Sequence, residues 1–180
     1  SFSEGGDKVN AVWEANLNPE RSRNLVKDVF FFESAIDAMS FYQINKNKYD
    51  FNNSTFISTG GAISQMQIQN VLKAYPEAKK RACFDNDMTG RFYDATLAAA
   101  VRGDRLQAHV KGFKVRCTFN GTEFKKDFQE KPTLKELDAI LGVKLSDKIS
   151  VHKAPPGVKD FNEVVKNAQA KSVIKKGRGV

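Results

Sequence analysis

The chain has 180 residues, of which 41% are hydrophobic and 28% charged, and its formal net charge is +8 at pH 7. This length suits one globular domain, or one domain that carries a sizeable insertion. No apolar run approaches the roughly 20 residues that a membrane-spanning helix requires, and no signal peptide is recognisable. We therefore expect a cytoplasmic protein with no membrane partner. Because the chain begins at Ser1 rather than Met, we also expect it to be a fragment of a longer protein.

The charge is distributed unevenly along the chain. Residues 1–100 carry 11 basic and 12 acidic side chains, whereas residues 101–180 carry 18 basic and 9 acidic ones. A basic half beside an acid-bearing half suits a polyanion that is held by Lys and Arg and presented to a metal ion. A solvated lysine-rich surface explains the same totals. Charge alone therefore leaves nucleic-acid binding open.

The first strong element follows a polar lead-in segment, residues 1–28, in which at most one edge strand is expected. Residues 29–32 are four consecutive apolar side chains, which indicates a strand covered on both faces. Glu33 ends this strand. Residues 34–43 then show apolar side chains at helical spacing, so a helix follows directly.

Two further strand-then-helix units succeed it. Residues 55–59 form a short predicted strand, and Gly60 and Gly61 at its end allow a tight turn or a close approach to a ligand. Residues 81–84 form the third strand. Consecutive units of this kind predict a parallel sheet with crossover helices.

Two acids follow the third strand, at Asp85 and Asp87. Side chains two residues apart in an extended chain point the same way, so these carboxylates can face one point and attract a cation. Mg²⁺ is the natural candidate, since it favours one or two carboxylates together with water and phosphate. A solvated turn is the alternative explanation for this pattern. Ligands of parallel sheets bind beyond the carboxyl ends of the strands, where Glu33 is also expected.

The pattern changes over residues 108–146. Apolar and polar residues alternate over 113–119, Asn120-Gly121 is a type I′ turn signal, and residues 133–136 form a capping box that opens a helix. We interpret this segment as an inserted β-hairpin and helix. Its lysines and aromatic side chains can hold a nucleic-acid strand, or the segment is a structural appendage.

The sheet is expected to resume with a fourth strand over residues 149–153, followed by a last helix that opens near Asp160. The predicted core comprises residues 29–107 and 147–170, and residues 171–180 form a basic tail. The fold class is therefore α/β, with a mainly parallel four-stranded sheet, helices on both of its faces and the inserted hairpin and helix.

Three stretches together resemble the Toprim domain, the metal-binding module of bacterial primases, topoisomerases and some nucleases, which has a Rossmann-like fold. They are Phe31-Phe-Glu33-Ser-Ala-Ile-Asp37-Ala, Ser58-Thr-Gly60-Gly61, and Phe84-Asp85-Asn-Asp87-Met-Thr-Gly90. Residues 159–163, Lys-Asp-Phe-Asn-Glu, resemble the closing motif of Toprim-like primase proteins of bacterial plasmids and conjugative elements. The resemblance covers about residues 29–101 and resumes near residue 149.

The resemblance implies roles for individual residues. Glu33, Asp85 and Asp87 correspond to the catalytic and metal-binding acids, with Mg²⁺ as the ion and Mn²⁺ as a substitute. Supporting positions are Asp37, Gly60, Gly61 and Asp160, and Lys153 and Lys159 are expected to steady phosphate.

The function implied is Mg²⁺-dependent nucleotidyl transfer of the primase kind, in a mobile-element protein for DNA replication or mobilisation. Expected partners are a DNA or RNA primer and template, and zinc-binding or helicase-type domains of a parent chain. Alternatives are a strand-nicking nuclease and a non-catalytic nucleic-acid docking module. A haloacid-dehalogenase-like phosphatase, with Asp85 as nucleophile, matches Asp85-Asn-Asp87-Met-Thr89 but leaves Glu33 without a role.

Overall fold

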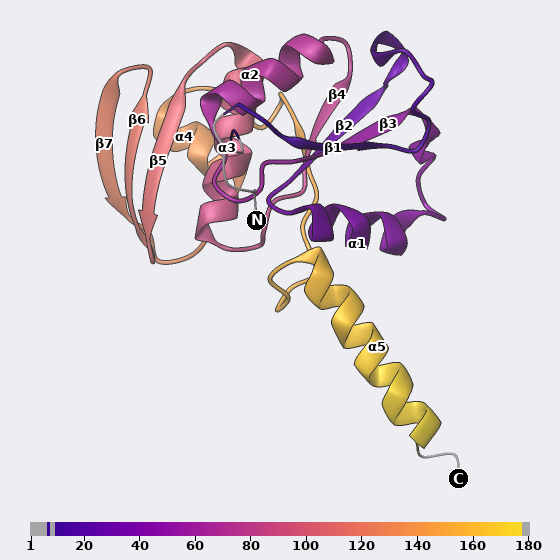
Figure 1. Cartoon of the computed structure of the whole chain (residues 1–180). Coiled ribbons are helices and arrows are strands. Elements are labelled where there is room, and N and C mark those ends of the chain that lie inside the picture. Colours follow the sequence, from indigo (N-terminus) through magenta and orange to yellow (C-terminus); the bar gives the residue numbers. More distant parts are fainter. Residues whose placement is uncertain (1–6, 8–9, 178–180) are drawn as a thin grey trace.

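The computed structural model describes Asp7 and residues 10–177, and it contains two β-sheets (Figure 1). The larger sheet has five strands in the order β1-β3-β2-β4-β8, of which β1 is antiparallel and the others are parallel. These strands span Trp13–Asn16 (β1), Asp28–Phe32 (β2), Ser54–Ser58 (β3), Lys79–Ala82 (β4) and Ser150–Val151 (β8). The predicted α/β class and mainly parallel sheet are confirmed, and β1 adds an edge strand from the lead-in segment.

Helices cover both faces of this sheet. They are α1 (Ala35–Asn45), α2 (Gln65–Ala74), α3 (Met88–Arg102) and α5 (Phe161–Gly177), with single 3-10 turns at Arg23–Leu25 and Phe51–Asn53. Successive strand residues point to opposite faces. Val29 and Phe31 accordingly pack with α2 and α3, whereas Phe30 and Phe32 pack with α1 and the start of α5. Both faces of β2 are therefore buried, as its continuous apolar run predicts.

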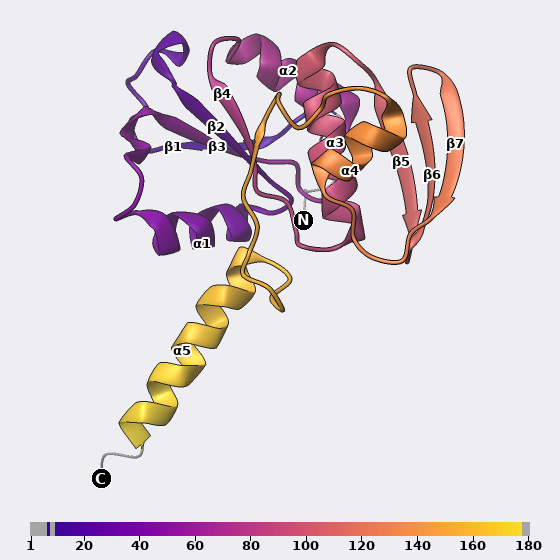
Figure 2. The ribbon, with the colours of Figure 1, turned by 180° about the vertical axis from the view of Figure 1, so that it is seen from behind.

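The smaller sheet is antiparallel, with strand order β5-β6-β7, and packs against α3 beside the short helix α4 (Figures 1 and 2). Its elements span Leu106–Lys111 (β5), Lys114–Phe119 (β6), Thr122–Asp127 (β7) and Leu134–Leu141 (α4). Helix α3 contributes Leu97 to the core of the larger sheet and Phe92 to that of the smaller one. Its alanines give the helix a slim profile, so sheets can pack closely on two of its sides.

The structure differs from the sequence interpretation in two places. The segment interpreted as a hairpin has a third strand, β5, whose inward residues Leu106, Ala108 and Val110 join the same core. Helix α5 runs to Gly177, so the part of the basic tail up to that residue is helical. Residues 1–6 and 8–9 of the lead-in segment, and 178–180 of the tail, lie outside the described residues.

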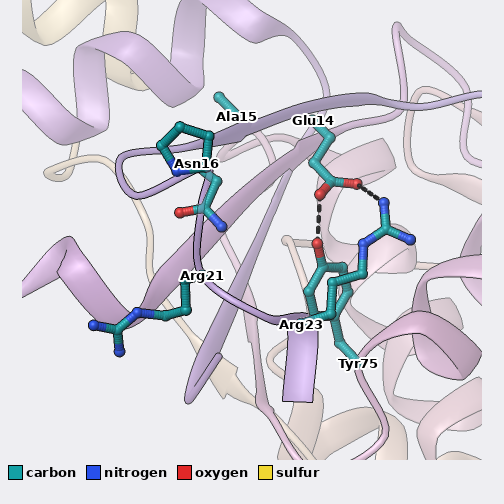
Figure 3. Close-up of a pocket in the computed structure, with 7 residues that line it drawn as sticks. Glu14, Ala15, Asn16, Arg21, Arg23 and Tyr75 are labelled. Atoms are coloured by element: carbon teal, nitrogen blue, oxygen red, sulfur yellow. Dashed lines mark hydrogen bonds and ion pairs between the residues drawn. The ribbon is translucent and has the colours of Figure 1, made fainter. Parts of the chain in front are cut away.

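The edge strand β1 is anchored to the end of α2 through Glu14. One carboxylate oxygen of Glu14 accepts a hydrogen bond from the Tyr75 hydroxyl, and the other contacts Arg23 Nη2 at 3.4 Å. The Arg23 guanidinium lies over the Tyr75 ring, 5.6 Å from its centre. These residues line a cavity of about 500 Å³ (Figure 3). Glu14, the acid of this cavity, thus holds β1 against the end of α2 through Tyr75.

Both cysteines, Cys83 and Cys117, are buried free thiols. Among the helices that the structure describes, none combines the length and the apolar character needed to cross a membrane.

Candidate active site

The carboxyl ends of β2, β3 and β4 meet at one edge of the larger sheet, next to the start of α5. A cavity of about 840 Å³ opens there and is lined by Glu33, Gly60, Gly61, Asp85 and Asp160, among others. The backbone N–H of Asp85 donates a 3.1 Å hydrogen bond to Glu33 Oε1. Residues from three strand ends and from the last helix are therefore brought together, as expected for a parallel sheet.

Glu33 is held by the glycine turn that follows β3. The Gly61 N–H donates to the Glu33 carbonyl at 2.9 Å, and the Ser58 hydroxyl donates to the same oxygen at 3.2 Å. Gly60 and Gly61 have φ angles of 70° and 116°, a region that side chains with a Cβ rarely adopt. The two glycines thus act as supporting residues that fix the backbone of Glu33.

The Asp85-Asn86-Asp87 loop leads directly into α3. Asp87 caps this helix, because its Oδ1 accepts the Gly90 N–H at 2.9 Å. Gly90 lies inside the first helical turn rather than in a turn of its own, and a Cβ placed on it would come within 2.1 Å of the Asp85 carbonyl oxygen. Gly90 is therefore required for the close approach of the loop to the helix, a role that the sequence alone did not reveal.

Lys153 does not face the cavity, which corrects its predicted role in phosphate binding. Its side chain is only 12% exposed, and its Nζ lies 2.8 Å from Asp94 Oδ2. The same nitrogen donates to the carbonyl oxygens of Phe84 and Asp85 at 3.0 and 3.1 Å. These acceptors take up the three protons of the ammonium group. Lys153 consequently supports the backbone of the acidic loop from the side that faces α3.

Lys159, by contrast, reaches the acids directly. Its Nζ lies 3.0 Å from Asp85 Oδ2 and 3.8 Å from Asp87 Oδ2, and its side chain is 59% exposed. The Lys159 carbonyl oxygen accepts the Asn86 N–H at 2.6 Å. The segment before α5 therefore pairs with the acidic loop and places the exposed Lys159 ammonium group at its mouth.

Asp37 and Asp160 organise the two helices that border the cavity. Asp37 is buried, and its carboxylate accepts hydrogen bonds from the Ser34 hydroxyl and the Asn162 N–H. Asp160 caps α5 by accepting the Glu163 N–H at 2.7 Å. The Asp37–Asn162 contact joins α1 to α5 at the edge of the site, whereas the Asp160 cap fixes the start of α5.

The surroundings of the cavity raise the pKa of Glu33 and of Asp85. The pKa of Glu33 rises from 4.5 to about 7, first because the group is buried and second because Asp85 is close. Burial also raises the pKa of Asp85, and the Lys159 ammonium opposes this effect. A carboxyl group with a pKa near neutrality can accept or give a proton under physiological conditions.

The acids suit a hard divalent cation in kind. In the part of the chain that the structure describes, no three carboxylate, imidazole or thiol groups are already gathered around a metal position. Mg²⁺ does not require such a cage, because it usually binds one or two carboxylates together with water and substrate phosphates. Asp85 and Asp87 each direct one oxygen toward a shared cation, the Lys159 ammonium. The same two carboxylate oxygens can therefore bind a divalent ion such as Mg²⁺ in place of the ammonium group.

Comparison with known proteins identifies a family but no individual relative. The family described as Toprim-like matches residues 30–130, which is more than half of the chain. No curated protein and no solved structure gave a match. The matched residues include Glu33, the glycine turn and both acids of the loop, and they continue through the smaller sheet. With the predicted fold and the convergence of these residues, the match shows that the chain belongs to the Toprim-like family.

Proposed function

We propose that this protein uses the acidic cavity for Mg²⁺-dependent chemistry on DNA phosphodiesters, most simply nucleotidyl transfer of the primase kind. Membership of the Toprim-like family indicates a metal-dependent role in DNA processing. The observation that carries the proposal is the contact between Glu33 and the acidic loop: a carboxyl group of pKa about 7 beside two carboxylates that face one cation.

Each residue has a distinct part in this proposal. Asp85 and Asp87 would hold the divalent ion, which supplies neutralisation of the charge on the phosphate oxygens. Glu33 holds or accepts the proton of the attacking or leaving hydroxyl. Lys159 lies at the mouth of the cavity and can exchange its carboxylate partners for a phosphate of the substrate. Lys153, Gly90 and the glycine turn keep these groups in place.

The assignment to primer synthesis rests on the likeness of residues 159–163 to the closing motif of mobile-element primases. The contacts of Lys159 with Asp85 and Asn86 support this assignment. A Toprim nuclease would use the same acids to cut a strand, and it is the second candidate. The family match removes the reason to consider a haloacid-dehalogenase-like phosphatase.

The first test is a titration with Mg²⁺ and with Mn²⁺, in which binding is measured by calorimetry and NMR. We expect wild type to bind, and Asp85→Asn/Asp87→Asn to lose at least about tenfold in affinity. The matched control is Glu20→Gln/Glu77→Gln, which removes two exposed acids and should bind like wild type. An absence of binding to wild type, even with DNA present, would overturn the proposal and leave a docking module.

The second test compares primer synthesis with nicking of single-stranded DNA, with Glu33→Gln as the probe. Loss of a general acid or base typically slows a reaction by 10²- to 10⁴-fold, whereas metal binding should largely persist in this variant. Primer extension that depends on Glu33 supports the primase assignment. Nicking with the same dependence replaces it by the nuclease.

A further inference from the structure

The outer face of the smaller sheet concentrates basic side chains. Strand residues alternate between the two faces, and the inner positions of β5 and β6 are buried against α3 and α4. The outward positions are Gln107, His109 and Lys111 on β5, Lys114, Arg116 and Thr118 on β6, and Glu123, Lys125 and Asp127 on β7. All but Thr118, which is half-buried, are exposed.

The register of the sheet places like charges directly opposite one another. Lys111 on β5 is the cross-strand partner of Lys114 on β6, and Arg116 is the partner of Lys125 on β7. Directly opposed like charges destabilise a sheet. Among the basic residues of this face only Lys114 has a directly opposed acid, Asp127, so the excess of positive charge points to an anionic partner that offsets the repulsion.

The same face is hollowed where these residues meet. A depression of about 390 Å³ is lined by His109, Lys111, Lys114, Arg116 and Lys125, and Asp127 is its one acidic wall residue. Glu123 contacts Arg116 at 3.4 Å, but both side chains are more than half exposed, and such pairs are weak. The guanidinium therefore remains available to a phosphate.

A second hollow lies between the acidic loop and the β5–β6 turn. It measures about 430 Å³ and is lined by Asp87 and Thr89 from the loop, by Phe113 from the β5–β6 turn, and by Lys131. Phe113 is 49% exposed. Lys111 and Lys114, which line the first depression, flank Gly112 and Phe113 of the turn, which line the second.

We propose that the outer face of the smaller sheet is a docking track for a DNA strand, which passes over Phe113 into the acidic site. The inference rests on the proposed function, because that site gives the strand its destination. The basic side chains bind phosphates in a sequence-independent manner, and Phe113 offers a ring on which an unpaired base can stack. An exposed aromatic beside basic residues is typical of single-strand binding, so the partner assigned is single-stranded DNA.

The test measures binding of fluorescent oligodeoxythymidylate by anisotropy, without divalent metal and over a range of about 50 to 200 mM salt. In Lys114→Gln/Arg116→Gln/Lys125→Gln we expect affinity to fall about tenfold and the salt slope to decrease by about 2, because three phosphate contacts are lost. Phe113→Ala should weaken binding with no change in slope. The control Lys46→Gln/Lys48→Gln/Lys73→Gln removes the same charge from exposed positions in the turn after α1 and on α2 and should leave both quantities unchanged.

Thermal unfolding separates this role from a structural one. The outer-face variant should be at least as stable as wild type, because opposed like charges have been removed. Binding of the variant equal to that of wild type, or equal losses in the control, would overturn the proposal. So would an equal dependence of phosphatidylserine vesicle binding on the same three side chains, which would indicate a general anionic surface.

Failure of this proposal can be distinguished from failure of the proposed function. Metal titration of the outer-face variant reports on the acidic site independently. If DNA binding is unaffected while metal binding persists, the track is wrong and the proposed function stands. If wild type binds no metal but the outer-face substitutions weaken DNA binding, the track stands and the catalytic assignment is wrong.

Discussion

Lys153 and Asp94 form an ion pair beneath the acidic loop, with 2.8 Å between Nζ and Oδ2, and their side chains are only 12% and 2% exposed. The pair joins the segment after β8 to the middle of α3. Because Lys153 also donates to the carbonyl oxygens of Phe84 and Asp85, the ion pair supports the loop that carries Asp85 and Asp87.

Replacing Lys153 should cost both stability and metal affinity. Lys153→Met leaves the buried Asp94 without its partner, and breaking a buried pair in this way typically destabilises a protein by about 3–5 kcal/mol. Urea unfolding measures this change. In Lys153→Met/Asp94→Leu we expect stability to recover but Mg²⁺ affinity to stay low, since the loop carbonyls remain unsupported. Recovery of both would contradict a positioning role and reduce the pair to a structural one.

The carboxyl group of Glu33 should make stability depend on pH. Its pKa is about 7 in the folded chain, against an ordinary value of 4.5, so the native state binds this proton more tightly than the unfolded chain. The resulting stabilisation is complete below about pH 4.5 and is lost as the pH rises through 7. Glu33→Gln should therefore gain about 2 kcal/mol over wild type at pH 8 without metal, less than the full shift implies because Glu33 is partly exposed.

Denaturant unfolding at a series of pH values provides this measurement. The two proteins should approach equal stability near pH 4, and Glu20→Gln, which changes an exposed acid, should follow wild type throughout. A constant difference between wild type and Glu33→Gln across the series would show that the proton on Glu33 is not responsible.

Gly90 should be intolerant of even a methyl group. Because a Cβ at this position would lie 2.1 Å from the Asp85 carbonyl oxygen, Gly90→Ala must displace the loop or the helix, at a cost of about 3 kcal/mol. The displacement should also weaken metal binding. Thr89→Ala, in the same helical turn, is the control and should change stability by less than about 1 kcal/mol. Wild-type behaviour of Gly90→Ala would show that the loop can relax without loss.

Lys159 should compete with the metal ion. Its ammonium lies 3.0 Å from Asp85 Oδ2 and is well exposed, so the contact is worth less than about 1 kcal/mol. Lys159→Met should therefore raise Mg²⁺ affinity by up to about fivefold in the absence of DNA, while weakening binding of a DNA strand. Lys166→Met, on an exposed position of α5, should do neither. Reduced metal affinity in Lys159→Met, measured by calorimetry, would contradict this competition.

The order of the strand-then-helix units was predictable because each unit carries its own local signal. Val29 to Phe32 is a continuous apolar run, and Glu33 and Asp85 follow the ends of their strands, so parallel topology alone brings them together. Strand β5 was also detectable in principle, because Leu106, Ala108 and Val110 alternate with polar residues. Its position directly after α3 concealed it.

The supporting contacts could not be predicted in the same way. Lys153 lies far from Asp94 in the chain, and only the packed structure shows that its ammonium points under the loop rather than into the cavity. Gly90 has a helical backbone without a positive φ, so the reason for a glycine is the nearby carbonyl of Asp85 and not a turn. Such contacts depend on tertiary packing, which no local pattern records.

Helix α3 contributes side chains to the cores of both sheets, so the packing of each sheet depends on the same helix. Phe92 and Ala95 are buried only because the smaller sheet and α4 cover them, while Leu97 completes the core of the larger sheet. A truncation after Arg102 would uncover an apolar strip along the very helix that Asp87 caps. The boundary of a minimal fragment therefore cannot be drawn there, because the segment interpreted as an insertion packs on the same helix that follows the acidic loop.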